Sequence, residues 1–121
     1  MAIGKDKLPD WPPGWSGSIS HSDEVAGAVA MPVAGRASTV LGLDLERIVP
    51  PGTARQIASG VMPERSPGGS GLPLAEEITR VFSAKEALCE ALFPHTRQFR
   101  EFSAASIDWH RDGPGDPVRV R

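Results

Sequence analysis

The sequence predicts an α+β protein in which a small, mainly antiparallel sheet packs against a helix. Three stretches carry this prediction: residues 39–46 alternate apolar and polar side chains, residues 25–30 form a short apolar run, and residues 87–92 show helical spacing of apolar side chains. Alternation with period two is typical of a half-buried strand, whereas spacings of three and four residues place side chains on one helical face.

Length and composition limit the classes of protein that remain. The chain has 121 residues, enough for one ordinary domain, and its net charge of −2 gives no general attraction to nucleic acid. Cys89 is the only cysteine, which excludes an internal disulfide and a multi-cysteine zinc site. The longest apolar run, residues 25–33, is much shorter than the ~20 residues of a membrane span. We therefore expect a cytoplasmic protein without a membrane span.

The N-terminal third predicts an irregular start and then a strand. Residues 1–17 contain proline and glycine residues that remove hydrogen-bond donors and interrupt any repeat, and Trp11 and Trp15 are expected to hold this segment in place. A turn at residues 21–23 then leads into the apolar run of residues 25–30, which is compatible with a buried strand that ends at Pro32.

Residues 39–46 are the clearest predicted strand. Leu41, Leu43 and Leu45 fall on one face of it, and the residues between them, which include Asp44 and Glu46, fall on the other. The prolines and glycine of residues 50–52 end this strand.

Two helices are predicted in the second half, on either side of a loop. Residues 54–61 favour a short helix, and residues 62–73 are rich in serine, proline and glycine, as in a flexible loop. Ser83 and Glu86 have the spacing of a capping box, so the second helix either begins there and ends at Pro94 or already runs from residue 74 to residue 93. Strand-like alternation returns at residues 99–109 and again from residue 118.

Asp44 and Glu46 are the first candidates for a functional site. Two carboxylates two residues apart on a strand point to the same face and can reach one hard cation such as Mg²⁺. Taken alone, such a pair is more often a solvated strand face. Glu86 likewise has a structural explanation as a capping residue, and Cys89 fits a small core position on the helix better than a nucleophile.

The order of four motifs is more specific than any of them alone. Gly17–Ser22 reads GSISHS, Leu41–Glu46 reads LGLDLE, Phe82–Ala87 reads FSAKEA, and Leu-Phe-Pro follows at residues 92–94. This series resembles the 4′-phosphopantetheinyl transferases of the surfactin and enterobactin type, over residues 4–107. The resemblance implies their two-lobed fold, of which residues 1–121 would form one partial domain, incomplete at both ends.

The resemblance also implies roles for individual residues. Asp44, Glu46 and Glu86 would bind Mg²⁺ against the pyrophosphate of coenzyme A. Lys5, Ser20 and His21 would contact the phosphates of the coenzyme. Lys85 would lie beside the metal as a catalytic residue, and Glu86 would accept the proton of the attacking serine.

The implied reaction is Mg²⁺-dependent transfer of 4′-phosphopantetheine from coenzyme A to a serine of an acyl, peptidyl or aryl carrier protein, with release of 3′,5′-ADP. Such transferases serve siderophore or secondary-metabolite biosynthesis. Members of the family carry a lysine one helical turn after the glutamate of the Lys-Glu pair, where this chain has Glu90. The alternative interpretation is therefore a non-catalytic remnant that binds coenzyme A or a carrier protein weakly.

Other classes fit less well. The short, trimeric holo-carrier-protein synthases have a similar length, but their Gly-x-Asp strand lies near the N-terminus, whereas about 40 residues precede it here. A Ser/His/Asp hydrolase would need a Gly-x-Ser-x-Gly elbow, and a nucleotide-binding P-loop would need Gly-x-x-x-x-Gly-Lys. The sequence contains neither motif.

Overall fold

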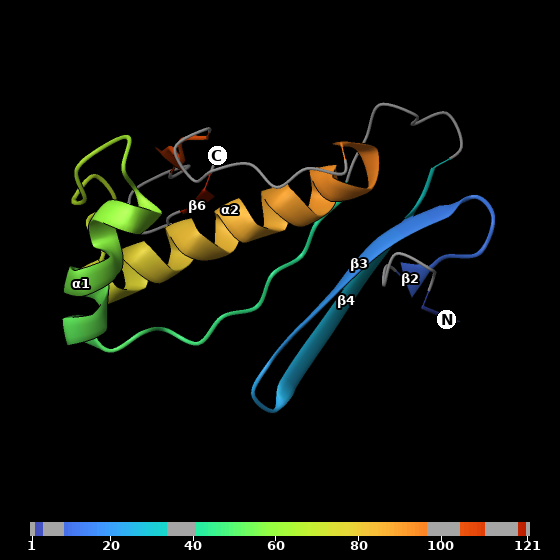
Figure 1. The fold of residues 1–121 in the computed structure, drawn as a ribbon, viewed down its shortest axis with the longest axis horizontal. Coiled ribbons are helices and arrows are strands. Elements are labelled where there is room, and N and C mark those ends of the chain that lie inside the picture. The colour runs from blue at the N-terminus through green and yellow to red at the C-terminus, as the bar shows by residue number, and fades with distance from the viewer. Residues whose placement is uncertain (1, 4–8, 34–40, 97–104, 111–118, 121) are drawn as a thin grey trace. The chain divides into compact units, whose positions relative to one another are not determined.

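A computed structural model describes residues 2–3, 9–33, 41–96, 105–110 and 119–120. Its elements, in chain order, are β1 (Ala2–Ile3), β2 (Pro9–Asp10), β3 (Trp15–Ser22), β4 (Val25–Pro32), α1 (Pro51–Val61), α2 (Leu74–Thr96), β5 (Trp109–His110) and β6 (Arg119–Val120) (Figure 1). In the described residues β1 pairs with β2, β3 with β4 and β5 with β6, each time antiparallel. The predicted α+β class with antiparallel strand pairs is confirmed.

The chain forms two compact units. The first comprises Met1–Leu45 and Glu86–Phe99, and the second comprises Glu46–Lys85 and Arg100–Arg121. Helix α2 contributes its N-terminal half to the second unit and its C-terminal half to the first. No helix within the described residues is both long enough and apolar enough to cross a membrane.

The hairpin of β3 and β4 is the largest strand pair of the first unit (Figure 1). Ser22 pairs with Val25, so Asp23 and Glu24 form the turn, and Asp23 takes a φ of 51°, which aspartate tolerates in turns. The strand predicted at residues 25–30 is confirmed. It is not buried, however: Val25 is 62% exposed, and exposed residues alternate with half-buried ones along β4. Much of β4 is therefore exposed.

The tryptophans of the N-terminal segment behave differently from each other. The ring of Trp11 lies against Gly17, where a Cβ atom would overlap it, so Trp11 does hold this segment against β3. Trp15 is 48% exposed, and the expectation that it also anchors the segment is wrong.

The strand predicted at residues 39–46 is wrong for residues 41–46, which have no regular secondary structure; residues 39 and 40 lie outside the described residues. The backbone N–H of Leu43 donates to Ser18 Oγ at 3.0 Å, and the N–H of Leu45 donates to Ser20 Oγ at 2.9 Å. Because serine hydroxyls of β3 accept these N–H groups, the segment runs beside β3 without a strand ladder.

The sidedness predicted for this segment is correct for the residues in contact. Gly27 of β4 faces the side chains of Leu43 and Leu45, so both leucines lie on the hairpin side. Gly42 faces the opposite way, with the Ala87 carbonyl of α2 directly against its Cα. The segment is therefore a layer between the hairpin and the C-terminal half of α2.

We expect Gly42→Ala to lower the free energy of unfolding by about 2–3 kcal/mol, because the added methyl group would overlap the Ala87 carbonyl oxygen. Gly60→Ala is the matched control: this helical glycine faces open space, and the change should raise the free energy of unfolding by about 0.5–1 kcal/mol. Urea unfolding of both variants measures the difference. An equal effect at the two positions would contradict the close approach at Gly42.

The second unit has its core between α1 and the N-terminal half of α2. Pro51 occupies the first turn of α1, where its missing N–H is not needed. The short helix predicted at residues 54–61 is thus confirmed and begins three residues earlier. The buried core consists of Ala54, Val61, Met62, Ile78, Val81 and Ile107.

Helix α2 starts at Leu74, which confirms the longer of the two predicted helices. Ser83 lies in its interior, so the predicted capping box is wrong, and the helix continues past Pro94 to Thr96. The predicted apolar stripe is buried only in part: Ala91 is buried, but Leu88 is 40% exposed.

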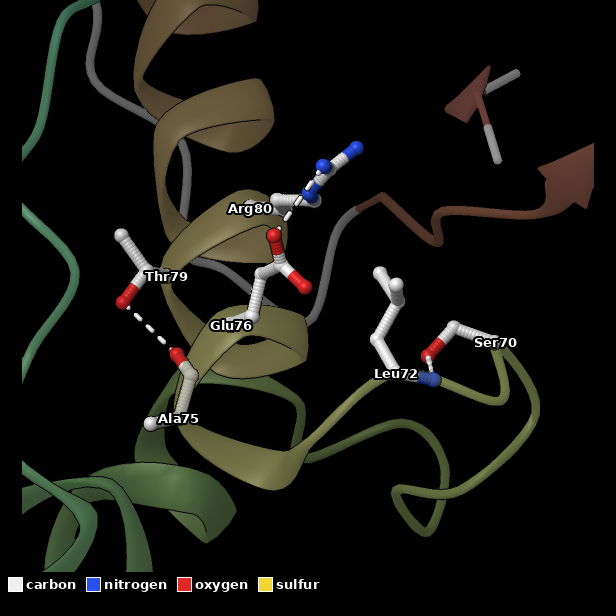
Figure 2. A network of polar contacts seen from close by, with 6 residues as sticks. All are labelled: Ser70, Leu72, Ala75, Glu76, Thr79 and Arg80. Carbon is white, nitrogen blue, oxygen red and sulfur yellow. Dashed lines mark hydrogen bonds and ion pairs between the residues drawn. The ribbon is translucent and has the colours of Figure 1, made fainter. Parts of the chain in front are cut away.

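Glu77 holds the loop of residues 62–73 against the start of α2. Its carboxylate, 1% exposed, accepts the N–H groups of Gly68 at 2.8 Å and Ser70 at 3.2 Å, and also the Ser70 hydroxyl. Figure 2 shows the neighbouring contacts, in which Leu72 N–H donates to Ser70 Oγ, and Thr79 and Arg80 bond to residues one turn earlier. The loop is irregular, as predicted; its flexibility stays a prediction.

The predicted strands near the C-terminus are partly present. Of residues 99–109, residues 99–104 lie outside the described residues, residues 105–108 are irregular, and Trp109 begins β5. Strand β6 lies within the alternation predicted from residue 118.

Candidate functional site

Three carboxylates face one another within the first unit. Asp44 lies in the segment that packs on α2, two residues after the close contact of Gly42 with Ala87. On α2, Glu86 directly precedes Ala87 and Glu90 follows it by three residues. Glu86 and Glu90 are one helical turn apart, so they lie on the same face of the helix. All three are partly buried.

Burial and neighbouring negative charges raise the pKa values of Glu86 and Glu90. Burial, followed by the negative charge of Asp44, raises the pKa of Glu86. Burial also raises the pKa of Glu90, and the charges of Asp44 and Glu86 raise it further, against the opposing effect of a hydrogen bond from Ser18. Apart from burial, Glu86 is thus harder to ionise because of Asp44, and Glu90 because of both Asp44 and Glu86.

Ser18 connects the hairpin to this group. Its hydroxyl, in a residue only 8% exposed, donates to Glu90 Oε2 at 3.2 Å and accepts the N–H of Leu43. Ser18 and Ser20 lie on the same face of β3, two residues apart, and both serve the segment that carries Asp44. The hairpin therefore positions Asp44 through its hydroxyl groups.

We expect Glu90→Gln to stabilise the chain at pH 7. Glu86 and Glu90 have folded pKa values above their ordinary 4.5, so between 4.5 and the raised values the folded chain holds more protons than the unfolded chain, and stability falls as pH rises. The glutamine removes the charge and keeps an acceptor for Ser18. The gain at pH 7 should be on the order of 0.5 kcal/mol, the scale of one like-charge pair on a helix, and should vanish near pH 4.

Glu76→Gln is the control for this measurement, because Glu76 forms an ion pair with Arg80 at 3.2 Å on the same helix. Loss of this ion pair should slightly destabilise the chain at pH 7. A Glu90→Gln variant less stable than the original chain at pH 7 would show that the Ser18 contact outweighs the repulsion.

The structure brings together some of the predicted site residues and not others. Asp44 and Glu86 lie close enough for one charge to act on the other, whereas Glu46 is exposed and belongs to the other unit. Ser20 lies on the covered face of β3, but His21 lies on the opposite, exposed face. Lys85 is engaged in the second unit, and Lys5 lies outside the described residues.

Magnesium fits the kind of donors present. Among the described residues no set of three or more His, Cys, Asp or Glu side chains is gathered tightly enough to hold a metal ion. Glu46 belongs to the other unit, and the triad of Asp44, Glu46 and Glu86 stays a prediction. Asp44 and Glu86 nevertheless offer the hard oxygen ligands that Mg²⁺ prefers, usually one or two carboxylates completed by water and substrate phosphate. A cation between them would also relieve their mutual repulsion.

Sequence reasoning missed two residues that matter to the geometry. Ser18 could have been noticed from the Ser-x-Ser spacing, which places both hydroxyls on one face of a strand. Glu64, the partner of Lys85, lies 21 positions away from it in the chain, and no local pattern indicates their contact.

Comparisons with known proteins point to one family of enzymes. A family model described as the 4′-phosphopantetheinyl transferase N-terminal domain matches residues 1–31. Enterobactin synthase component D of Salmonella typhi is 34% identical over 92 residues, which are 74% of this chain and 37% of that protein. The 4′-phosphopantetheinyl transferase PptT of Mycobacterium tuberculosis is 34% identical over 112 residues, 88% of this chain and 47% of that protein.

The matched proteins place the chain in one class of enzymes, the transferases, and in one family within that class. The chain belongs to the 4′-phosphopantetheinyl transferase family. It spans less than half the length of these curated relatives.

Proposed function

We propose that this chain takes part in transferring the 4′-phosphopantetheine group from coenzyme A to a serine of an acyl, peptidyl or aryl carrier protein, releasing 3′,5′-ADP. Membership of the family supports the class of reaction. The observation that carries the proposal is the juxtaposition of Asp44 and Glu86, from two separate parts of the chain, within one compact unit.

The reaction requires charge neutralisation more than covalent help from the protein. The serine oxygen attacks the β-phosphorus of coenzyme A, its bond to that phosphorus forms, and the bond to the leaving 3′,5′-ADP oxygen breaks. Asp44 and Glu86 would hold Mg²⁺, which, when bound, neutralises charge on the pyrophosphate. Glu46 would be the third ligand by family resemblance.

Glu86 is our candidate for the group that accepts the serine proton at a carboxylate oxygen. Burial and the neighbouring Asp44 raise its pKa, which moves it toward the range in which a carboxylate is an effective general base.

Three other residues are our candidates for contacts with the phosphates of coenzyme A. The Ser20 hydroxyl can donate to a phosphate oxygen, since its contact with Leu45 uses the serine only as an acceptor. His21 is exposed and would reach a ligand on its own face of β3; Lys5 would add a cation.

Thermal unfolding with and without coenzyme A tests the binding part of this proposal. A ligand that binds only the folded chain raises its stability by mass action, by about 2.7 kcal/mol at 100 times its dissociation constant. We expect a larger rise with Mg²⁺ than without it. The transfer itself is measured as the mass gain of an apo carrier protein incubated with coenzyme A and Mg²⁺.

Glu90 favours a second candidate function, a non-catalytic member of the family that binds coenzyme A or a carrier protein weakly. Glu90 adds a third negative charge next to Asp44 and Glu86, where the family carries a lysine. Stabilisation by coenzyme A without any mass gain of the carrier protein would favour this candidate. No stabilisation and no mass gain would contradict both.

A further inference from the structure

Lys85 is almost completely buried, which is rare for a lysine. Its side chain is 2% exposed, and Nζ donates to the backbone carbonyl of Val61 at 2.9 Å and to Glu64 Oε1 at 2.7 Å. Lysine and glutamate are seldom buried unless they are paired, because removing an ion from water costs several kcal/mol. All three residues belong to the second unit.

The position of Val61 explains what this ammonium group does. Val61 is the last residue of α1, and the final carbonyls of a helix have no partner within the helix and carry partial negative charge. Lys85 supplies a hydrogen bond and a positive charge at that end. Glu64, three residues further along, neutralises the ammonium group.

The pKa of Glu64 agrees with an ion pair between Glu64 and Lys85. Burial alone would raise the pKa of Glu64, but the hydrogen bond and charge of Lys85 outweigh it, and the pKa is lowered. Glu64 is also part of the wall of a cavity of about 660 Å³ next to the end of α1, together with Arg55, Ser59, Met62, Arg65 and Ser66. The Lys85–Glu64 contact thus holds one side chain of that wall in place.

We propose that Lys85 is a positioning residue, which fixes the C-terminal end of α1 and the adjoining cavity wall to α2, and that it does not contact coenzyme A. This inference goes beyond the proposed function and does not depend on it. A lysine that served the phosphates of a ligand would need its ammonium group accessible, whereas here two acceptors of the protein occupy it.

Chemical labelling of lysine tests the proposal in the unmodified chain. We expect an amine-acylating reagent to label Lys85 about 100 times more slowly, or slower still, in the folded chain than in urea, because labelling requires local opening of the core. Coenzyme A with Mg²⁺ should leave that slow rate unchanged. Rapid labelling of Lys85 in the folded chain, suppressed by coenzyme A, would overturn the proposal.

Variants give a second, independent test through the midpoint of thermal unfolding. Lys85→Met leaves the partly buried Glu64 carboxylate without its partner and the end of α1 without its cation, so the midpoint should fall by about 10 °C or more. Lys85→Arg should recover part of this loss because it keeps the cation. Adding Glu64→Gln to Lys85→Met should also recover part of it, since the buried charge is then removed.

Arg80→Met is the matched control on the same helix, since it removes an exposed ion pair with Glu76 and should shift the midpoint by no more than about 2 °C. A Lys85→Met chain with an unchanged midpoint would overturn the proposed role. If Lys85→Met fails to fold, the loss of folding supports the role, and the labelling of the original chain still decides whether Lys85 meets coenzyme A.

Discussion

Replacing Glu90 by lysine should raise the rate of phosphopantetheine transfer by a factor of about 10²–10³. At a phosphoryl-transfer site, one preorganised cation or donor commonly contributes a factor of this size. Glu90 lies beside Asp44 and Glu86, and their charges already raise its pKa, so an anionic pyrophosphate would meet three negative charges there. Lysine at this position replaces one of these negative charges by a positive charge.

The measurement is the initial rate of mass gain of an apo carrier protein with coenzyme A and Mg²⁺. Glu90→Gln is the matched control: it removes the negative charge without adding a positive one, so its rate should lie between those of the original chain and of Glu90→Lys. If the original chain is already as fast as a full-length transferase, Glu90 is not a defect. If the original chain and Glu90→Lys are both inactive and a longer chain is active, chain length limits the activity more than Glu90 does.

Asp44→Ala should abolish the Mg²⁺-dependent part of the stabilisation by coenzyme A. The charge of Asp44 acts on both Glu86 and Glu90. Without it the remaining donors come from one helix only, and a hard cation loses one of its two or three protein ligands. The expected result is an equal thermal shift with coenzyme A in the presence and absence of Mg²⁺.

Glu76→Ala is the control for Asp44→Ala, because it removes a carboxylate from an exposed ion pair of the second unit and should leave the Mg²⁺-dependent shift intact. An unchanged shift in Asp44→Ala would remove Asp44 from the metal site. Glu46→Ala in the same assay tests the family expectation that Glu46 is a ligand, since its loss should then reduce the shift as well.

Local sequence patterns predicted a helix or strand well where the pattern depends on that element alone. The short helix α1 and the long alternative for α2 were both readable from spacing and composition. Strand β3 was not predicted, and the turn expected at residues 21–23 lies at Asp23 and Glu24. The capping box at Ser83 failed because a helix that is already running needs no N-terminal cap. A four-residue motif cannot indicate whether the helix has already begun at Leu74, nine residues earlier.

The failure at residues 41–46 has a different cause. Alternating leucines predict an extended segment with two faces, and both faces are present, with Leu43 and Leu45 toward Gly27 and Gly42 toward Ala87. Whether such a segment is a strand depends on what accepts its N–H groups. Here the acceptors are the hydroxyl groups of Ser18 and Ser20, about 25 positions away in the chain.

By itself, the sequence determined the family motifs and their order, the strand β4, the two helices and the identity of the carboxylates. Only the tertiary structure decided which of these residues meet. Lys85 and Glu86 are adjacent in the sequence, yet successive residues of a helix point about 100° apart. Lys85 therefore caps α1 beside Glu64, while Glu86 meets Asp44. Spacing along one element determines its own faces, but packing between elements chooses the surroundings of each face.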